Sequence, residues 1–458
     1  MTTQRSIRRY TLFACLLLGA LLWSGASAMD TDSPQAGNLF SEFTGKITES
    51  DLKTDLFKNE YAIKRHFAKF NYAYFKETVI IPRSKGVKNP VLEIDFFHDD
   101  KPMKPKTTAY EYKDGLHHWE GEIEAQFFNQ AFFVVNEHGG FGNVQVDDRI
   151  ISFHPFAFNN EVIMVIEEMD ANKFPSCGVK SENDGDPKYV PKQGQGNYDI
   201  DILFVYPRYW NNLCGNSFWN RIFPDGILET YSEYLTDELD IKYRQEGVMH
   251  QITFRGHVLC SGFSPQGGDF ENDIDRLEAL QHVRQERDRV NADVVCMVAL
   301  EGDVCGLANS PWALGARSAE TAYNMIVLTS CVVANHSLAH EMGHLLGLKH
   351  ERADFPVLNG NPCQFGYYMR FAFNRDQLNN NPPLIRRSIM AIGTQARKQG
   401  IAKPSRIGLF SDGRDFRFAN IFVRMGISCN ANANNEFEKP ANNIETINQN
   451  VPILSTYR

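Results

Sequence analysis

Residues 340–350 read His340-Glu341-Met342-Gly343-His344-Leu345-Leu346-Gly347-Leu348-Lys349-His350 and form the most specific pattern in the chain. On a helix, positions i and i+4 lie on one face, so the imidazoles of His340 and His344 can bind one metal ion. Glu341 lies beside such an ion, and its carboxylate can take a proton from water. Gly347 can adopt the left-handed conformation that ends a helix, after which His350 approaches the ion from another direction. Three neutral imidazoles leave a fourth position open, which is typical of a catalytic zinc site.

The alternative is a surface helix that holds histidines by chance, but the full pattern is too specific for that. The extended string H-E-x-x-H-x-x-G-x-x-H resembles the metzincin zinc peptidases. In that clan a methionine in a tight turn lies beneath the metal, and Ser388-Ile389-Met390-Ala391 resembles this turn. Met369 is the competitor, but its aromatic neighbours are typical of ordinary core. Metzincins with a tyrosine ligand carry it two residues after the methionine. Ile392 occupies that position, so the resemblance is to the adamalysin/reprolysin-like branch.

The resemblance covers about residues 197–458. Asn197–Tyr206 is similar to the first strand of such catalytic domains, and Arg406–Ser411 is similar to the segment after the methionine turn. Cys305 and Cys331 resemble a disulfide-bonded pair of the family. The resemblance implies Zn²⁺ as cofactor and a twisted, mostly parallel sheet with the zinc helix across its cleft. It also implies a protein or peptide substrate that binds extended along an edge strand.

Cys177 stands in the segment Phe174-Pro175-Ser176-Cys177-Gly178-Val179, which resembles the cysteine switch of metzincin propeptides. A thiolate is a strong zinc ligand and can occupy the position where the catalytic water belongs. The alternatives are a disulfide with a downstream cysteine, or a buried thiol. Cys296 lies in an apolar strand where a free thiol is expected. This leaves six downstream cysteines that can pair with one another: Cys214, Cys260, Cys305, Cys331, Cys363 and Cys429.

Residues 1–28 resemble a secretory signal peptide, with three arginines, a short apolar run and the cleavage site Ala26-Ser27-Ala28. Its apolar run is too short to span a bilayer, so a retained anchor is the weaker alternative. Removal of the segment leaves 44 basic and 56 acidic residues, a net charge of −12. A chain this acidic is a poor candidate for a non-specific nucleic-acid binder. We expect a secreted or periplasmic protein that is monomeric and has no stable membrane span, and in those compartments disulfides form.

The part before residue 190 alternates between short apolar runs and turn residues, which predicts a mainly antiparallel β domain. Its expected strands are Val79–Ile81, Val91–Ile94, Phe132–Val135, Val144–Val146 and Val162–Ile166. We expect the scattered histidines of this region to lie on its surface: His98, His117, His118, His138 and His154. Residues 181–197 hold several Gly, Pro and charged residues, which is typical of a linker. Residues 29–190 are therefore expected to form a β-rich prodomain that contains the switch and the linker.

Residues 191–458 are expected to form the zinc metallopeptidase domain, because strands and helices alternate there. The expected strands are 200–206, 252–259 and 292–300, and the expected helices are 227–243 and 271–291. At the end of the chain, Ile444, Ile447, Val451 and Leu454 share one helical face, which predicts docking onto the domain. Pro452 is expected to kink or end that helix.

These features together predict an exported zinc-dependent endopeptidase that is made as a latent zymogen, with Glu341 as general base. Three alternatives stay open. The same chemistry could hydrolyse a substrate other than protein. The chain could also be a non-catalytic protein that keeps zinc for stability, although such a protein does not need Glu341. The third alternative is an envelope-bound recognition protein, which a permanently attached β domain would favour.

Overall fold

The computed structural model describes residues 37–98, 101–123, 129–146, 148–175, 177–178, 195–266, 268–309, 324–351, 363–372, 377, 384–392, 406–418, 421–429 and 441–455. The predicted signal peptide and residues 181–194 of the predicted linker lie outside these residues. Residues 38–458 form one compact unit, and residues 1–37 are grouped apart from it. No helix in the described part of the chain is long and apolar enough to cross a membrane.

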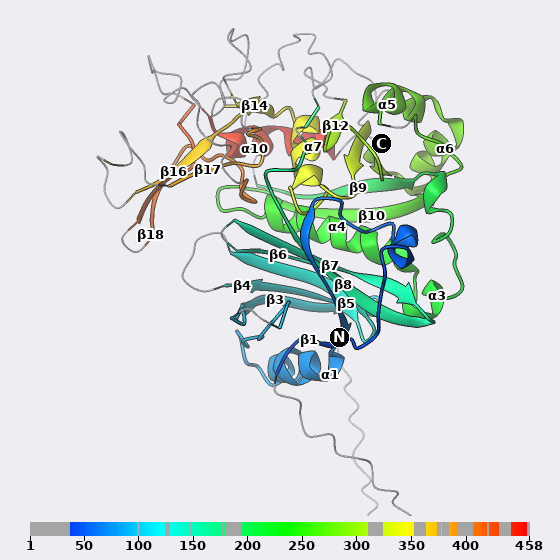
Figure 1. Cartoon of the computed structure of the whole chain (residues 1–458). Helices are drawn as coiled ribbons and strands as arrows, with labels where there is room; N and C mark the ends of the chain where they lie inside the picture. The colour runs from blue at the N-terminus through cyan, green and yellow to red at the C-terminus, as the bar shows by residue number, and fades with distance from the viewer. Residues whose placement is uncertain are drawn as a thin grey trace, which may run out of the picture. The chain divides into compact units, whose positions relative to one another are not determined.

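An eight-stranded sheet, antiparallel throughout, forms the first part of this unit, as the alternating apolar runs predict (Figure 1). Its strand order is β1-β2-β8-β7-β6-β5-β4-β3. Two hairpins turn through residue pairs with positive φ, Asp114-Gly115 and Asn159-Asn160, which suits the twist of tight two-residue turns. The strands are β1 (Phe40–Glu42), β2 (Ala62–Phe70), β3 (Lys106–Lys113), β4 (Leu116–Glu122), β5 (Gln130–Asn136), β6 (Gly139–Val146), β7 (Arg149–Phe158) and β8 (Glu161–Met169).

Two of the predicted strands in this part are wrong. Val79–Ile81 is helical and belongs to a segment of short turns that begins where the Asn71 side chain accepts the N–H of Tyr74. Val91 and Ile94 form only isolated bridges, to Lys106 and Met103. Short apolar runs do not distinguish strands from buried helical turns, which explains both errors. The helical elements are η1 (Asp51–Thr54), α1 (Tyr72–Phe75), η2 (Lys76–Ile80) and α2 (Ile81–Ser84).

The two faces of the antiparallel sheet belong to different hydrophobic cores. On β5, Phe133 and Val135 pack in a core that includes Phe75 and Val79 of the helical segment. Phe132 and Val134 point to the other face and join a core that continues into the second half of the chain. This alternation follows from the period of two along a strand. The sheet is therefore covered on both sides.

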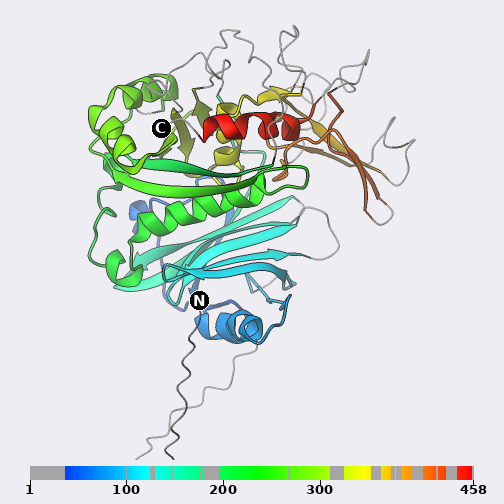
Figure 2. The same ribbon diagram turned by 180° about the vertical axis from the view of Figure 1, so that it is seen from behind.

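A five-stranded sheet forms the centre of the second half, in the order β10-β9-β11-β13-β12. β10, β9, β11 and β13 are parallel, and only β12 at the edge runs antiparallel, so the mostly parallel sheet is confirmed. Helix α4 (Ile227–Tyr243) has the predicted bounds and lies between the two sheets (Figure 2). The strands are β9 (Asn197–Tyr206), β10 (Gln251–Cys260), β11 (Val294–Ala299), β12 (Gly306–Ala308) and β13 (Asn324–Leu328).

The predicted helix 271–291 is two helices, α5 (Phe270–Ala279) and α6 (Gln281–Val290). The break falls at Leu280, whose extended backbone (φ −72°, ψ 110°) interrupts the helical hydrogen bonds. Leu280 packs against the core under these helices, so tertiary contact overrides the helical pattern here. The remaining short elements of this half are η3 (Arg208–Trp210) and α3 (Trp219–Ile222).

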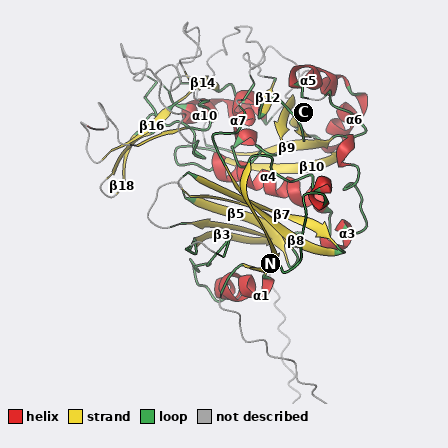
Figure 3. Ribbon diagram, viewed as in Figure 1, coloured by secondary structure: helices red, strands yellow, loops and turns green. Residues whose placement is uncertain are grey.

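The C-terminal part adds two small sheets and a helix. Figure 3 colours these elements by type. Helix α10 (Asn443–Leu454) buries the predicted apolar face, but it runs through Pro452 and does not end there. Proline in the last turn removes few hydrogen bonds, which explains why the helix continues. The strands are β14 (Lys349–Glu351), β15 (Phe365–Gly366), β16 (Tyr368–Ala372), β17 (Leu384–Arg387), β18 (Asp415–Phe418) and β19 (Ile421–Arg424).

Three disulfides join the six cysteines that were expected to pair: Cys214–Cys260, Cys305–Cys331 and Cys363–Cys429. The family resemblance predicted the second of these, which links β12 to the segment before the zinc helix. Cys177 and Cys296 are free, and both are buried. The disulfide alternative for Cys177 is therefore excluded in this structure.

Candidate metal centre

Helix α7 (Ser337–Leu345) carries His340 and His344, and both of its ends are defined by backbone with positive φ. It begins after His336, which has φ 53°. His336 is the N-cap residue, and no side chain forms a capping hydrogen bond there. At the other end Gly347 has φ 81°, as predicted, and the Leu348 N–H donates to the Gly343 carbonyl at 2.9 Å. The chain thereby reverses into β14.

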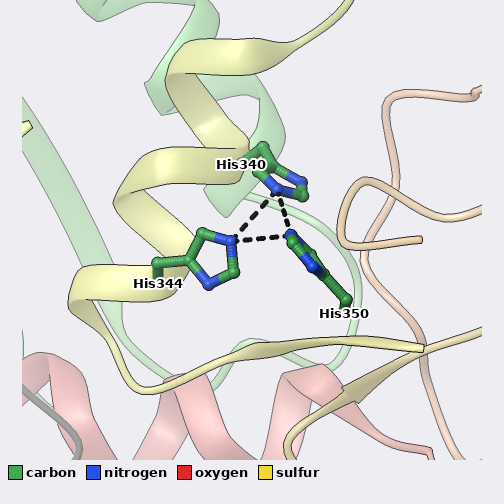
Figure 4. Close-up of side chains that lie close together, drawn as sticks. All are labelled: His340, His344 and His350. Atoms are coloured by element: carbon green, nitrogen blue, oxygen red, sulfur yellow. Dashed lines mark hydrogen bonds between the residues drawn. The ribbon is translucent and has the colours of Figure 1, made fainter. Parts of the chain in front are cut away.

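The three predicted histidines converge (Figure 4). Their Nε2 atoms lie 3.1 Å apart between His340 and His350, 3.1 Å between His344 and His340, and 3.0 Å between His344 and His350. The other ring nitrogens face backbone carbonyls. His340 Nδ1 lies 2.8 Å from the oxygen of Ile389, and His344 Nδ1 lies 2.8 Å from that of Leu348. These carbonyls accept the Nδ1 protons, so the Nε2 lone pairs point at one another.

This arrangement fits a metal ion. Burial lowers the pKa of all three imidazoles well below its ordinary value, so they are neutral ligands. Converging lone pairs without a proton between them repel one another unless a cation lies among them. Tetrahedral zinc–nitrogen bonds of about 2.0–2.1 Å place ligand nitrogens about 3.3 Å apart, close to the spacing observed. The three side chains are buried, at 4% exposure or less.

Glu341 lies beside this cluster with its carboxylate buried. Both carboxylate oxygens lack a hydrogen-bond partner within the described residues. Burial, and after it the adjacent Cys177, raises the pKa of this carboxyl well above its ordinary value. A side chain at position 306 would collide with it, because a Cβ added to Gly306 lies 2.6 Å from Glu341 Cγ and Oε1. A buried carboxylate of this kind costs free energy unless a ligand or a reaction uses it.

The methionine predicted beneath the metal packs against the zinc helix. Ser388–Ala391 is a tight turn in which Ala391 N–H donates to the Ser388 carbonyl at 3.1 Å. Met390 is fully buried, and a Cβ added to Gly343 would lie 2.6 Å from its sulfur. The competitor Met369 lies in a separate core with Phe365 and Val423. The turn also orients the candidate ligand His340, because its Ile389 carbonyl faces that ring.

Cys177 reaches the same place from the upstream part of the chain. Its sulfur and ligand atoms of His340 and Glu341 all lie within 4.8 Å of one another. The next residue, Gly178, donates its N–H to the Gly306 carbonyl of β12 at 2.9 Å. The thiol is 5% exposed. Cys177 and Gly178 therefore lie between the edge strand β12 and the histidine cluster.

Two buried arginines adjoin Cys177, and the sequence reasoning missed them. Arg406 points Nη1 and Nη2 at the Cys177 sulfur, at 3.9 and 3.8 Å, and donates to the Asn335 carbonyl at 2.8 Å. Arg387 donates to the Ala391 carbonyl at 2.9 Å. Burial, and after it Arg406, lowers the pKa of Arg387 to about 9. Arg406 belonged to the segment that resembled the family, but nothing in its neighbours indicated a contact with Cys177, 229 residues earlier.

The predicted surface position of the upstream histidines is wrong for two of them. His117 is buried between the hydroxyls of Tyr72 and Tyr110, at 3.1 and 2.8 Å. His154 is buried with Nε2 2.9 Å from Asp55 Oδ2. Both stand on strands whose alternation turns them inward, and hydroxyl or carboxylate partners there satisfy the ring nitrogens. Neither histidine belongs to a metal-binding group within the described residues.

Comparison with known proteins agrees with the three-histidine geometry. Residues 261–351 match the family model described as "Metallo-peptidase family M12B Reprolysin-like". The chain carries a reprolysin-like metallopeptidase segment. This segment runs from α5 to β14 and includes β12, the zinc helix and all three histidines, so the resemblance stated from the sequence is confirmed. The match to this family model supports a metal-dependent peptidase with a peptide substrate.

No curated protein matches the chain. Among solved structures, one chain described as "Structure of a chaperone-substrate complex" has a TM-score of 0.38 and 16% identity, with 71% of this chain and 45% of that chain covered. Metalloproteinase-II from Bacteroides fragilis has a TM-score of 0.35 and 10% identity, with 58% of this chain and 82% of that chain covered. The chain thus spans less than half the length of the first of these. TM-scores below 0.5 do not establish a common fold, so the assignment rests on the reprolysin-like segment.

Proposed function

We propose that the protein is an exported zinc-dependent endopeptidase that is synthesised as a latent zymogen. The observation that carries this proposal is the convergence of three imidazole lone pairs beside the buried carboxylate of Glu341. The match of the reprolysin-like segment supports the peptidase class. A structural zinc site has four protein ligands and does not need a free carboxylate, so these features favour catalysis over a stabilising role.

Glu341 is the proposed general base. A zinc ion held by His340, His344 and His350 would supply a Lewis acid for water activation and carbonyl polarisation. Its carboxylate would take a proton from the attacking water and then deliver it to the leaving amine. The Ile389 carbonyl holds the ring of His340 in place, and Met390 packs against Gly343 on the same helix. The carboxylate is positioned by the helix, because it immediately follows His340.

The edge strand β12 is the proposed binding site for the substrate backbone. β12 pairs with β13 on one side only, and the Gly306 carbonyl on its other side accepts the Gly178 N–H. A substrate can add to such an edge as a further strand, using main-chain hydrogen bonds. The upstream segment therefore occupies the position that we assign to the substrate. Peptide bonds in extended chains are the substrate class that this geometry favours.

Latency is proposed to come from Cys177 in this same position. Its sulfur lies where a thiolate can bind the metal in place of water, and Gly178 blocks the edge strand. Residues 29–190 would then act as the inhibitory prodomain. Cleavage within the predicted linker at 181–197 frees the C-terminal end of the blocking segment. The export signal at 1–28 would bring the zymogen to a compartment where its disulfides form.

The test is cleavage of an unfolded protein by purified protein with its linker cut. We expect cleavage that a zinc chelator abolishes and that added Zn²⁺ restores. Parallel assays with ester and amide substrates other than peptides separate an endopeptidase from a different metallohydrolase. Bound zinc without cleavage of any substrate would contradict the proposal and favour the zinc-retaining binding protein.

A further inference from the structure

Helix α4 packs against the antiparallel sheet through buried aromatic side chains. Phe57 from the upstream part contacts Trp210 and Tyr231, with ring centroids 5.3 and 4.9 Å apart. Phe132 stacks on Tyr234 at 5.2 Å. These rings are buried and form part of a single hydrophobic core that extends from the antiparallel sheet to the zinc helix. Interfaces of permanent complexes have this composition, resembling a domain core cut in two.

Buried polar groups also cross this interface. Gln130 and Gln145 lie opposite each other on β5 and β6. Gln130 Oε1 accepts from Lys242 Nζ at 2.8 Å, and Gln145 Nε2 donates to the Arg406 carbonyl at 2.8 Å. Gln145 Oε1 also lies 3.0 Å from His336 Nε2, just before the zinc helix. Loss of the sheet would leave Lys242 and His336 without these partners, which is costly for buried groups.

Partly exposed ion pairs surround this buried contact. His118 Nδ1 lies 2.8 Å from Asp237 Oδ2, and Arg244 Nη2 lies 2.6 Å from Glu120 Oε1. Both pairs join β4 to α4. In addition, the Asn136 amide donates to the Ile222 carbonyl at 2.7 Å, and the Asn59 amide donates to the Ser330 carbonyl at 2.7 Å. An apolar centre with a polar rim is the usual anatomy of a stable protein–protein interface.

Within the described residues, the blocking segment makes fewer hydrogen bonds to the downstream half than the rest of the upstream part does. We define the arm as residues 170–178, which follow β8 and lead into the predicted linker. Within the described residues of the arm, Gly178 makes one backbone hydrogen bond to β12, and Cys177 lies beside Arg406 and the metal centre. Phe174 and Cys177 are also buried in a hydrophobic cluster that includes Leu307, and the ring of Phe174 contacts Tyr61 of the upstream part at 5.2 Å.

We propose that cleavage of the linker releases only the arm from the cleft, whereas the antiparallel sheet stays bound to α4 as a permanent, non-covalent subunit of the mature enzyme. This inference rests on the proposed latency for the role of the arm. Its physical basis is separate: removal of the sheet would expose the rings of Trp210, Tyr231 and Tyr234 together on one face. Soluble monomers rarely expose apolar patches of this kind. The mature protein is then two chains that share one core. Attachment of the sheet alone does not favour the recognition protein over the enzyme, because the arm and not the sheet reaches the metal centre.

The test is the mass of the cut protein in solution. A recognition sequence for a site-specific protease is placed within residues 183–190, the full chain is folded, and the linker is cut. The two fragments are then separated by gel filtration under native conditions, with an affinity tag on the upstream fragment. We expect co-elution at the mass of the whole protein, with both fragments in equal amounts. Separate elution of a soluble, folded downstream fragment would overturn the inference.

Two neighbouring phenylalanines provide a matched pair of variants. Phe132 faces α4, and Phe133 faces the opposite core of the same sheet. We expect Phe132→Leu to speed dissociation of the cut fragments by about tenfold or more, as expected for an aromatic anchor at an interface. Phe133→Leu is expected to leave the dissociation rate within about twofold, since it touches only the sheet's own core. Equal effects of the two would contradict the interface assigned here.

Co-elution and the dissociation rate of the fragments are measured without any catalytic assay. Co-elution of fragments from an inactive cut protein would leave this inference standing and contradict the proposed function. Activity of a downstream fragment that has separated would support the proposed function and overturn this inference. The two proposals therefore fail in different experiments.

Discussion

The two sides of the site differ in how they are held. On the metal side, His340, His344 and His350 come from eleven consecutive residues, and carbonyls of Ile389 and Leu348 fix two of their rings. On the blocking side, Cys177 lies at the end of an arm and faces Arg406, which is 229 residues distant in the chain. In the proposed mechanism the first side belongs to the catalytic half, and the second is a contact that cleavage of the linker removes. Substitutions on the metal side should therefore abolish the activity of the cut protein, and substitutions on the blocking side should activate the uncut protein.

The largest expected effect is on the metal side. Glu341→Gln removes the proposed base and keeps the size of the side chain, so we expect kcat/KM of the cut protein to fall by about 10²–10⁴-fold. Zinc content should stay at the wild-type level, because the three histidines are intact. Both are measured on the same preparation, by peptide cleavage and by metal analysis. Retention of full activity would contradict the role of Glu341.

The second largest expected effect is on the blocking side, where a substitution should raise activity and not lower it. In uncut protein we expect Cys177→Ala to raise activity to within a factor of about 10 of the cut wild type, a difference of about 1.4 kcal/mol. The matched control is Cys296→Ala, since Cys296 is the other free and buried thiol but lies within β11. The control should stay latent. Unchanged latency in Cys177→Ala would show that the thiol does not block the site.

A smaller effect is expected at the arginine that faces the thiol. Arg406→Lys keeps a positive charge but loses the planar fork that reaches both Cys177 and the Asn335 carbonyl. We expect the activity of uncut protein to rise about 2- to 10-fold, while the activity of cut protein changes less. Arg424→Lys, in an ion pair with Asp415 on the outer small sheet, serves as the control. An equal loss of activity in cut and uncut protein would assign Arg406 a structural role instead.

The smallest effect concerns the antiparallel sheet that carries the arm. Burial, and after it the neighbouring His118, lowers the pKa of His117 to about 4. The unfolded chain binds this proton near pH 6.5, whereas the folded chain binds it only near pH 4. The buried, neutral His117 therefore contributes fully to the free energy of unfolding above about pH 6.5. This contribution is lost as the pH falls towards 4.

Urea unfolding at pH 7 and pH 5 measures this loss. We expect His117→Gln to lose less stability than the wild type on acidification, because it removes the depressed group. The exposed His138→Gln should behave like the wild type. A wild-type protein whose unfolding free energy does not fall between these pH values would contradict the assignment.

The elements that the sequence predicts correctly are those with strong local patterns. Helix α4 has its predicted bounds because seventeen residues repeat with helical period, and the three histidines converge because helix and turn geometry bring them together. The expected strands at 79–81 and 91–94 are wrong because three or four apolar residues suit a buried turn as well as a strand. The predicted single helix at 271–291 breaks at Leu280, where packing decides the backbone.

The contacts that the sequence does not predict join distant residues. Nothing near Gln145 indicates that its side chain lies between His336 and Arg406, 191 and 261 positions later. The environment of Cys177 is intermediate between the locally predicted elements and these distant contacts. Its resemblance to a cysteine switch was visible, and its position beside Glu341 required the fold. Such contacts depend on how α4 lies between the two sheets, which no local pattern encodes.

X-ray absorption at the zinc edge of uncut protein tests the central claim most directly. The account predicts three nitrogen ligands and one sulfur ligand, with a zinc–sulfur distance of about 2.3 Å. In Cys177→Ala the sulfur should be replaced by an oxygen or nitrogen ligand, and in Cys296→Ala it should remain. A spectrum of uncut wild-type protein without sulfur would contradict the account, since the arm would then lie beside the metal without blocking it.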